Sequence, residues 1–172
     1  FILVLVFFVF HSFSYCNVFN GVTLFSVSSG IGSSNTYVIN NNYDVVNKWD
    51  HELSTIGIPH LDHDGSIILQ FRSIEHSFGN SHGPIGGTFK KLDWHGNEVW
   101  SNNFFSNSFH SHHDFEVMPN GNILILGWEK KTYSEALNAG RISVENEIWP
   151  LAIYEVALNS INQFEILWEW HI

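Results

Sequence analysis

Three passages of the sequence resemble one another, and this internal repeat limits the fold more than any single residue does. Each passage contains a strand-like run followed by a Trp, and the passages lie at 36–69, 88–126 and 153–168. Trp49 and Trp100 are 51 residues apart, and Gly65 and Gly121 are 56 apart. These spacings are close to those of kelch-type and related propeller blades. We therefore predict an all-β chain that forms a partial β-propeller of about two and a half blades over residues 17–172.

Turn residues separate the expected strands. Asn120-Gly121 predicts a two-residue type I′ hairpin, because both central positions of that turn need positive φ, which Asn and Gly tolerate best. His95-Gly96-Asn97 and Asp64-Gly65 predict turns of the same kind. High aromatic content, with seven Trp and fifteen Phe, also favours strands, since flat rings pack well on pleated surfaces.

The third passage is delayed by an insertion, since Trp168 follows Trp100 by 68 residues. The insertion contains a capping-box pattern at Thr132-Tyr133-Ser134-Glu135, then helix formers and a terminating Gly140. We predict one short inserted helix over about 133–139.

The first residues resemble the apolar core of a secretory signal. Phe1–Phe10 is wholly apolar before the sequence turns polar, so residues 1–16 are predicted to be the remnant of a signal peptide. The run is about half of the roughly 20 residues that a membrane helix needs, so no stable membrane span is expected. The protein is then exported, either periplasmic or secreted. Lipid attachment at Cys16 is a weaker alternative, and a single cysteine allows no internal disulfide.

Charge excludes one class of partner. The formal net charge is −10 with seven Lys and Arg in all, so the chain lacks the basic surface that nucleic acid or an anionic membrane requires. We also expect this length of chain to be a piece of the whole propeller. With unclosed strand edges it should aggregate or stay partly unfolded when isolated.

The densest group of ionisable residues is His110-Ser111-His112-His113-Asp114. In a regular strand His110 and His112 share one face and His113 points to the other, so the group is not expected to act as one block. An imidazole can be a nucleophile, a general acid or base, or a metal ligand, and Asp114 could fix a tautomer. The alternative is that these are strand-edge residues satisfied by the backbone.

The stretch from His112 to Glu129 resembles the HHD…PNGN…WE signature of the bacterial arylsulfotransferase family. Further segments are similar to that family: the opening 21–25, Asn35-Thr36-Tyr37, the inserted helix with Ala139-Gly140-Arg141, and the stretch 166–171. The resemblance implies a six-bladed propeller that transfers a sulfuryl group from an aryl sulfate to a phenol. It implies no cofactor and no nucleotide sulfate donor, with a sulfohistidine as the intermediate of a ping-pong reaction.

The resemblance also implies the site residues. His112 and His113 would contact the sulfate, one of them being the nucleophile unless that His lies in further blades. Asp114 would be the orienting carboxylate, while Arg141 and His171 would bind substrate. His60 and His63 are interpreted as turn residues, with metal binding as the alternative.

Two other functions stay open at this point. A non-catalytic propeller used for binding would keep the repeat without the chemistry. A metal-dependent hydrolase would use His110, His112 and Asp114, although no second cluster has the spacing of a standard zinc motif. The recurring Trp49, Trp100 and Trp168 are predicted to be packing residues between blades rather than an aromatic cage.

Overall fold

Antiparallel strands account for most of the residues that the computed structural model describes, namely 19–28, 32–73 and 85–172. The prediction of an all-β chain is confirmed, and none of the described sheets closes on itself. The predicted signal remnant at 1–16, including Cys16, lies outside the described residues.

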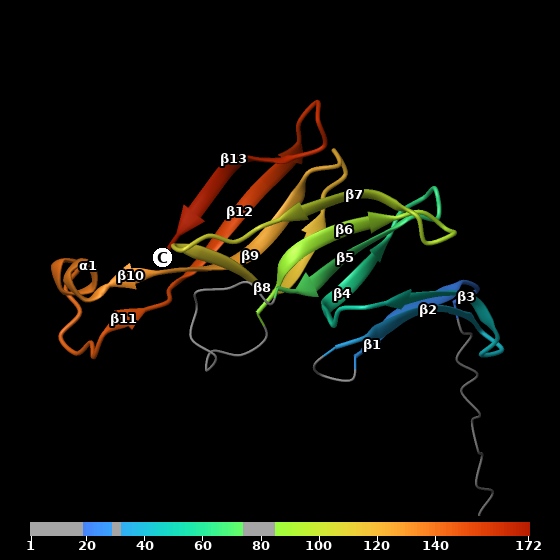
Figure 1. Cartoon of the computed structure of the whole chain (residues 1–172), viewed down its shortest axis with the longest axis horizontal. Helices are drawn as coiled ribbons and strands as arrows, with labels where there is room; N and C mark the ends of the chain where they lie inside the picture. The colour runs from blue at the N-terminus through green and yellow to red at the C-terminus, as the bar shows by residue number, and fades with distance from the viewer. Residues whose placement is uncertain (1–18, 29–31, 74–84) are drawn as a thin grey trace, which may run out of the picture.

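Three sheets make up the body of the molecule (Figure 1). Sheet 1 contains β1 (Val22–Ser28), β2 (Ser34–Asn40) and β3 (Val45–His51). Sheet 2 contains β4 (Thr55–Leu61), β5 (Ile67–Arg72), β6 (Gly87–Leu92) and β7 (Glu98–Asn103). Sheet 3 contains β8 (Phe109–Val117), β9 (Ile123–Glu129), β12 (Leu151–Leu158) and β13 (Phe164–His171). Every neighbouring pair of strands in them is antiparallel and sequential within its sheet.

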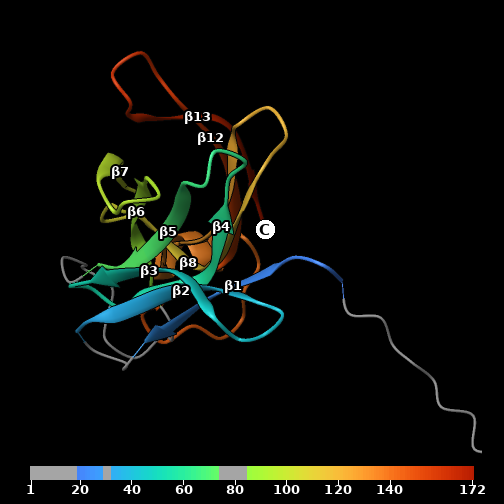
Figure 2. The ribbon, with the colours of Figure 1, turned by 90° about the vertical axis from the view of Figure 1, so that its right-hand side faces the viewer.

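The sheets stack face to face, with sheet 2 in the middle (Figure 2). β5 shows this arrangement best, because all its residues except the last are buried. Alternate side chains of a strand point to opposite faces. Ile67 and Leu69 accordingly pack toward sheet 1, while Ile68 packs toward sheet 3. One strand thus contributes to both hydrophobic cores.

The first strand of each sheet lies near the first strand of the next. β1 lies against β4, and β4 lies against β8. The remaining strands of sheets 2 and 3 follow outward in sequence order. The strand that carries the His-rich segment, β8, is therefore the edge strand of sheet 3 that lies against β4 of sheet 2.

The same kind of turn joins the two strands in several hairpins, and it is not the predicted type I′ turn. In the Met118–Asn122 turn, Gly121 N donates to Met118 O and Met118 N donates to Asn122 O, both at 2.8 Å. Gly121 has a φ of 85°, but Asn120 is not among the residues with positive φ. This pattern is a type I turn followed by a left-handed residue, so the hairpin prediction was right and its turn type was wrong. The turns ending at Tyr43, Gly65, Gly96 and Asn162 show the same backbone bonds.

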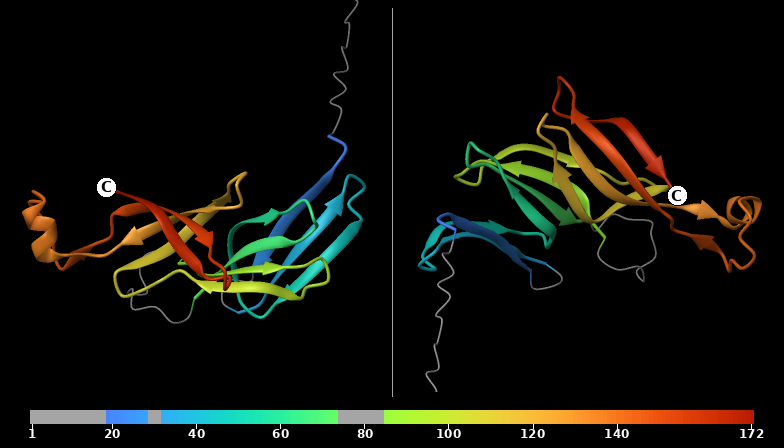
Figure 3. Two further views of the ribbon diagram at one scale, coloured as in Figure 1. Left: turned by 90° about the horizontal axis from the view of Figure 1, so that it is seen from above. Right: turned by 180° about the vertical axis from the view of Figure 1, so that it is seen from behind.

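The insertion between β9 and β12 forms an excursion from sheet 3 (Figure 3). It consists of β10 (Lys131–Thr132), α1 (Tyr133–Asn138) and β11 (Glu147–Ile148). The predicted helix and its capping box are confirmed, since Thr132 and Glu135 bond reciprocally at its N-terminus. Within the described ranges, no helix has the length and hydropathy of a membrane span.

Two of the recurring Trp residues lie between sheets, as predicted. Trp49 of sheet 1 donates its Nε1–H to the carbonyl of Asp93 in sheet 2 at 2.9 Å. Trp100 of sheet 2 packs edge-on against Phe164 of sheet 3, with 5.6 Å between ring centroids. Each Trp therefore joins its own sheet to the next.

We predict that Trp100→Ala lowers the free energy of unfolding by about 3–5 kcal/mol, because it empties a large volume between sheets 2 and 3. Urea denaturation followed by far-UV circular dichroism measures the loss. Trp94→Ala is the matched control, since Trp94 is partly exposed and meets Trp49 edge to face. This variant should lower the free energy of unfolding by roughly 1–2 kcal/mol. Equal losses in both variants would contradict this account of the core.

Candidate functional site

A β-bulge in β8 sets the conformation of the His-rich segment. The register with β9 shifts between Ser111 and Phe115, and His113 has a φ of 55°. A left-handed backbone is costly for a residue with a Cβ, and it persists only where its surroundings hold it. Bulges re-aim side chains and occur often beside functional sites. The regular alternation expected for this strand therefore ends at His112.

The bulge brings the rings of His112 and His113 together. Their Nδ1 atoms are 2.6 Å apart, and the rings meet edge to face with centroids 4.9 Å apart. The prediction that His113 points away from His112 was wrong, because it assumed regular strand geometry. At this distance one Nδ1 carries the proton and the other accepts it, so each ring fixes the tautomer of its neighbour.

Trp128 of β9 completes this cluster. Its ring stacks on His112 with centroids 4.1 Å apart and an angle of 20°, and it meets His113 edge-on at 6.0 Å. The stacked Trp128 ring limits the rotation of the His112 imidazole.

The two histidines differ in exposure. His112 is 2% exposed, whereas His113 is exposed to solvent. Burial lowers the pKa of His112 to about 4, the nearby His113 adds to this effect, and the backbone of Gly127 opposes it. His112 is therefore neutral at pH 7. Its Nε2 is buried as well.

Polar residues from sheet 2 lie behind the cluster. Gln70 of β5 donates from Nε2 to Ser111 Oγ at 2.9 Å, which joins sheets 2 and 3 by a buried hydrogen bond. A Cβ on Gly86 would collide with the Gln70 side chain, so a larger residue there would displace this bond. The Nδ1 of His110 lies 2.9 Å from Ser111 O, and its ring stacks on Phe105. His110 therefore belongs to the packed base of the site.

Gly57 of β4 supports the bulge from the neighbouring sheet. Its φ is 72°, and a Cβ at this position would collide with the carbonyl oxygen of His113. The close approach of β4 to β8 thus depends on a missing side chain.

Asp114 makes a local contact only. Its Oδ1 accepts a hydrogen bond from its neighbour's amide, Phe115 N, at 3.0 Å. No hydrogen bond joins this carboxylate to His112 or His113. The orienting role of Asp114 therefore stays a prediction, and in the structure the polar contact of the two imidazoles is with each other.

Arg141 lies on the excursion, directly after α1. Its backbone N donates to Ala136 O at 3.0 Å, and the residue is exposed. The excursion projects from the end of sheet 3 (Figure 3). The structure gives Arg141 no contact with the two histidines.

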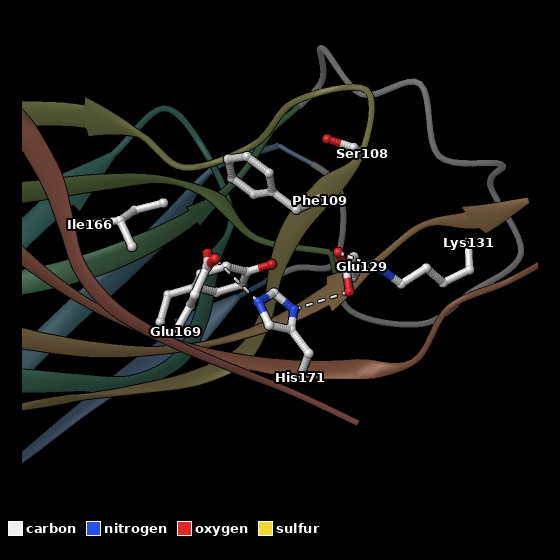
Figure 4. A pocket seen from close by; sticks show the side chains of 8 residues that line it. Ser108, Phe109, Glu129, Lys131, Ile166, Glu169 and His171 are labelled. Atoms are coloured by element: carbon white, nitrogen blue, oxygen red, sulfur yellow. Dashed lines mark hydrogen bonds and ion pairs between the residues drawn. The ribbon is translucent and has the colours of Figure 1, made fainter. Parts of the chain in front are cut away.

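His171 lies in a separate pocket of about 340 Å³ (Figure 4). Its Nδ1 is 3.0 Å from Glu129 Oε2 and its Nε2 is 3.5 Å from Glu169 Oε1. Tyr154 faces the ring edge-on, and burial and these two carboxylates raise the pKa of Tyr154 to about 12. His171 is on the same sheet as His112 and does not contact it.

Sequence reasoning missed two members of the site. Gln70 is a polar residue within the otherwise apolar run Ile67-Ile68-Leu69-Gln70-Phe71, and that pattern alone could have marked it as a buried polar contact. Trp128 was considered only as one of four Trp residues that could stack on an aryl group, and its contact with His112 was not predicted. In the described part of the chain, no three His, Cys, Asp or Glu residues gather closely enough to hold a metal ion, including those around His60 and His63.

Comparison with known proteins gives no relative for this chain. No protein-family model, curated protein or solved structure matches it.

A second buried histidine allows a test of the electrostatics. His51 lies between sheets 1 and 2, and its Nε2 is 2.9 Å from Thr36 Oγ1. Burial lowers its pKa to about 4, as in His112.

We predict that the protein loses stability as the pH falls from 6.5 toward 4. Unfolded histidine binds a proton near pH 6.5, but folded His51 and His112 do not bind it until about pH 4. Below pH 6.5 the unfolded state therefore binds more protons than the folded state. The free energy of unfolding then falls by at most about 1.4 kcal/mol per pH unit for each histidine. Denaturation between pH 5 and 7 measures the slope. This slope of stability with pH should be smaller in His51→Phe and in His112→Phe than in the unaltered chain. It should be unchanged in the exposed control His63→Phe.

We also predict that Gly57→Ala lowers the free energy of unfolding by about 1–3 kcal/mol, through both the strained φ and the collision with His113 O. The His112 and His113 ring signals in NMR should shift. Gly121→Ala is the control, since it shares the positive φ but would have nothing within 4 Å of its new Cβ. If Gly121→Ala perturbs the histidines as strongly, β4 does not support the bulge.

Proposed function

We propose that this chain is part of a β-propeller enzyme that transfers a sulfuryl group from an aryl sulfate to a phenolic acceptor. The observation that carries the proposal is the hydrogen-bonded pair of His112 and His113 on β8, the edge strand of sheet 3. The resemblance of the surrounding sequence to the arylsulfotransferases selects sulfuryl transfer among the reactions that such a pair could perform.

The stacking of the sheets supports the propeller. Sheets 2 and 3 are four-stranded, antiparallel and sequential, as blades are. Their first strands adjoin one another and adjoin β1. In the proposed propeller, β8 would face the axis about which further blades are arranged.

His113 is the proposed nucleophile. If His113 Nδ1–H donates to His112 Nδ1, the exposed Nε2 of His113 carries the lone pair. This nitrogen attacks the sulfur of the aryl sulfate, and the S–O bond to the ring breaks. The electron pair leaves with the phenolate oxygen, and the sulfuryl group becomes bonded to His113 Nε2.

The second step reverses the first with another phenol. The acceptor oxygen attacks the sulfur, the N–S bond breaks, and its electron pair returns to His113 Nε2. The acceptor's proton balances the phenolate released in the first step. The two half-reactions share one site, which gives ping-pong kinetics.

His112 is the proposed positioning residue. Its low pKa keeps it neutral near pH 7, so its Nδ1 can remain a hydrogen-bond acceptor for His113. Trp128 stacks on the same ring and limits its rotation. This neutral acceptor takes the part first expected of the Asp114 carboxylate. Arg141 and His171 remain predicted substrate contacts that the further blades would have to complete.

The test uses protein expressed from the complete gene with 4-nitrophenyl sulfate as donor. We expect nitrophenol release that depends on added phenol, and a trapped enzyme adduct with the mass of one sulfuryl group on His113. His113→Ala should lower kcat at least about a thousandfold and abolish the adduct.

Two further variants separate the roles of the histidines. His112→Ala should lower kcat by about a hundredfold with KM little changed, while His112→Asn, which retains an acceptor oxygen, should recover part of that loss. His63→Ala, an exposed turn histidine, is the matched control and should be within twofold of the unaltered enzyme. Nitrophenol release that does not depend on added phenol would indicate a hydrolase. No nitrophenol release would indicate a binding protein.

A further inference from the structure

A Trp ring covers one end of the interface between sheets 1 and 2. Trp94 lies in the β6–β7 turn and meets Trp49 of sheet 1 edge to face, with centroids 5.6 Å apart. It also covers Gly65, since a Cβ on this glycine would be 3.2 Å from Trp94 Cε3. The Nε1–H of Trp49 donates to the carbonyl of Asp93 in the same turn at 2.9 Å. One turn thus supplies both a flat ring and an oxygen acceptor to the recurring Trp.

The corresponding end of the interface between sheets 2 and 3 contains a pocket of about 500 Å³. Trp100 and Gly121, the repeat counterparts of Trp49 and Gly65, both line it. A Cβ on Gly121 would meet nothing within 4 Å, so this glycine lies open where Gly65 is covered. Sheets 2 and 3 already pack on each other, so further blades of the proposed propeller would lie outside this interface.

The β12–β13 turn has the same local bonds as the β6–β7 turn but different side chains. Its first residue, Asn159, accepts two amide hydrogen bonds through Oδ1, as Asp93 does in the β6–β7 turn. The next residue is Ser160 in sheet 3, whereas it is Trp94 in sheet 2. The turn of sheet 3 therefore has no ring to place where Trp94 lies in the first interface.

Trp100 also lacks the carbonyl partner that Trp49 has. The β12–β13 turn is held by Asn102 instead, whose Nδ2 donates to Asn162 O at 3.0 Å and whose Oδ1 accepts from Phe164 N at 3.1 Å. Among the residues that the structure describes, none accepts a hydrogen bond from the Nε1–H of Trp100. Trp100 is 7% exposed and lines the pocket, so a ligand there would supply the acceptor that this buried donor needs.

The pocket is large enough for a fused pair of rings. A cavity of about 150 Å³ accommodates benzene, and ligand pockets measure about 300–1,000 Å³. Both sheets supply apolar side chains to the lining, sheet 2 with Ile68 and Trp100, and sheet 3 with Val117, Ile123 and Leu158. A flat apolar ligand would therefore be in contact with both sheets.

The charges beside the pocket favour a neutral ligand. Lys91 lines it, and its Nζ is 2.7 Å from Asp62 Oδ2 and 3.8 Å from Asp64 Oδ2. Because the two carboxylates outnumber the single ammonium, an anionic ligand would meet net repulsion. The pocket is therefore unsuited to an aryl sulfate, and its lining includes neither His112 nor His113.

We propose that this pocket binds a small neutral aromatic compound that carries a carbonyl oxygen beside its ring. The ring takes the place that Trp94 fills in the first interface. The oxygen accepts a hydrogen bond from Trp100 Nε1–H, as Asp93 O does from Trp49. This binding site is separate from the residues of sulfuryl transfer and does not depend on that function.

Isothermal titration calorimetry of protein expressed from the complete gene tests the proposal. The probe is oxindole, a flat bicyclic lactam with a carbonyl oxygen, and we expect one site per chain with a Kd of about 0.1–1 mM. Indole, which has similar fused rings but no oxygen, should bind about three- to tenfold more weakly, the effect of one missing hydrogen bond. Caprolactam, a lactam without an aromatic ring, should give no measurable binding.

Variants locate the site. Trp100→Phe keeps an aromatic ring but removes the Nε1–H, so it should bind oxindole no more tightly than indole. Leu158→Glu puts a charge on the apolar lining and should weaken oxindole binding at least about tenfold. Ile161→Glu is the matched control, because it adds the same charge in the adjoining turn at a 73% exposed residue outside the lining, and it should bind within about twofold of the unaltered protein. Circular dichroism and a cooperative melt establish that each variant folds, and Met118→Glu replaces Leu158→Glu if that variant does not.

Three results would overturn the proposal. Oxindole could give no binding heat at about 10 mM, roughly ten times the weakest expected Kd. Caprolactam could bind as tightly as oxindole, which would mean that the site does not select an aromatic ring. Leu158→Glu could bind oxindole as the unaltered protein does, which would place the binding outside this pocket.

Discussion

The burial of sheet 2 on both faces is the constraint on which the rest of the structure depends. β5 places alternate side chains in two different cores, so sheets 1 and 3 must lie on opposite sides of it. Trp49 and Trp100 then join each sheet to the next. Because each layer repeats this relationship, the three described sheets resemble a one-dimensional array in which each sheet packs on its neighbours. Trp168 of sheet 3 and Phe25 of sheet 1 are 49% and 37% exposed.

The candidate site arises where this packing meets an irregular strand. The bulge in β8 places His113 in a left-handed conformation, and the neighbouring β4 has room for it only because residue 57 is glycine. The result is a buried neutral imidazole bonded to an exposed one, with Trp128 stacked on the buried ring. Backbone strain of this kind is often retained at functional sites, where the surrounding structure holds it in place. The proposed division of roles, with His113 attacking and His112 positioning, follows from that difference in burial.

Sequence patterns predicted those features that depend on neighbours along the chain. The strands, the hairpins and the α1 helix with its capping box follow from local alternation, turn residues and caps, and the structure contains them. The prediction failed where a distant segment decides the geometry. The direction of the His113 side chain depends on the register of β8 with β9 and on the approach of Gly57, neither of which is visible within the sequence 110–114. The same reason explains why Gln70 was missed, since its partner Ser111 lies on another sheet.

By itself the sequence determined an all-β chain with a repeat, a helical insertion and a dense group of histidines. These properties rest on periods of two residues in strands, on turn chemistry and on the spacing of Trp and Gly, all of which are visible in the order of residues along the chain. The tertiary structure alone decided which histidine is buried, that two imidazoles are hydrogen-bonded, and that Arg141 and His171 lie apart from them. Those facts depend on how one sheet packs on the next, because burial and close contact between distant residues exist only after the sheets have stacked.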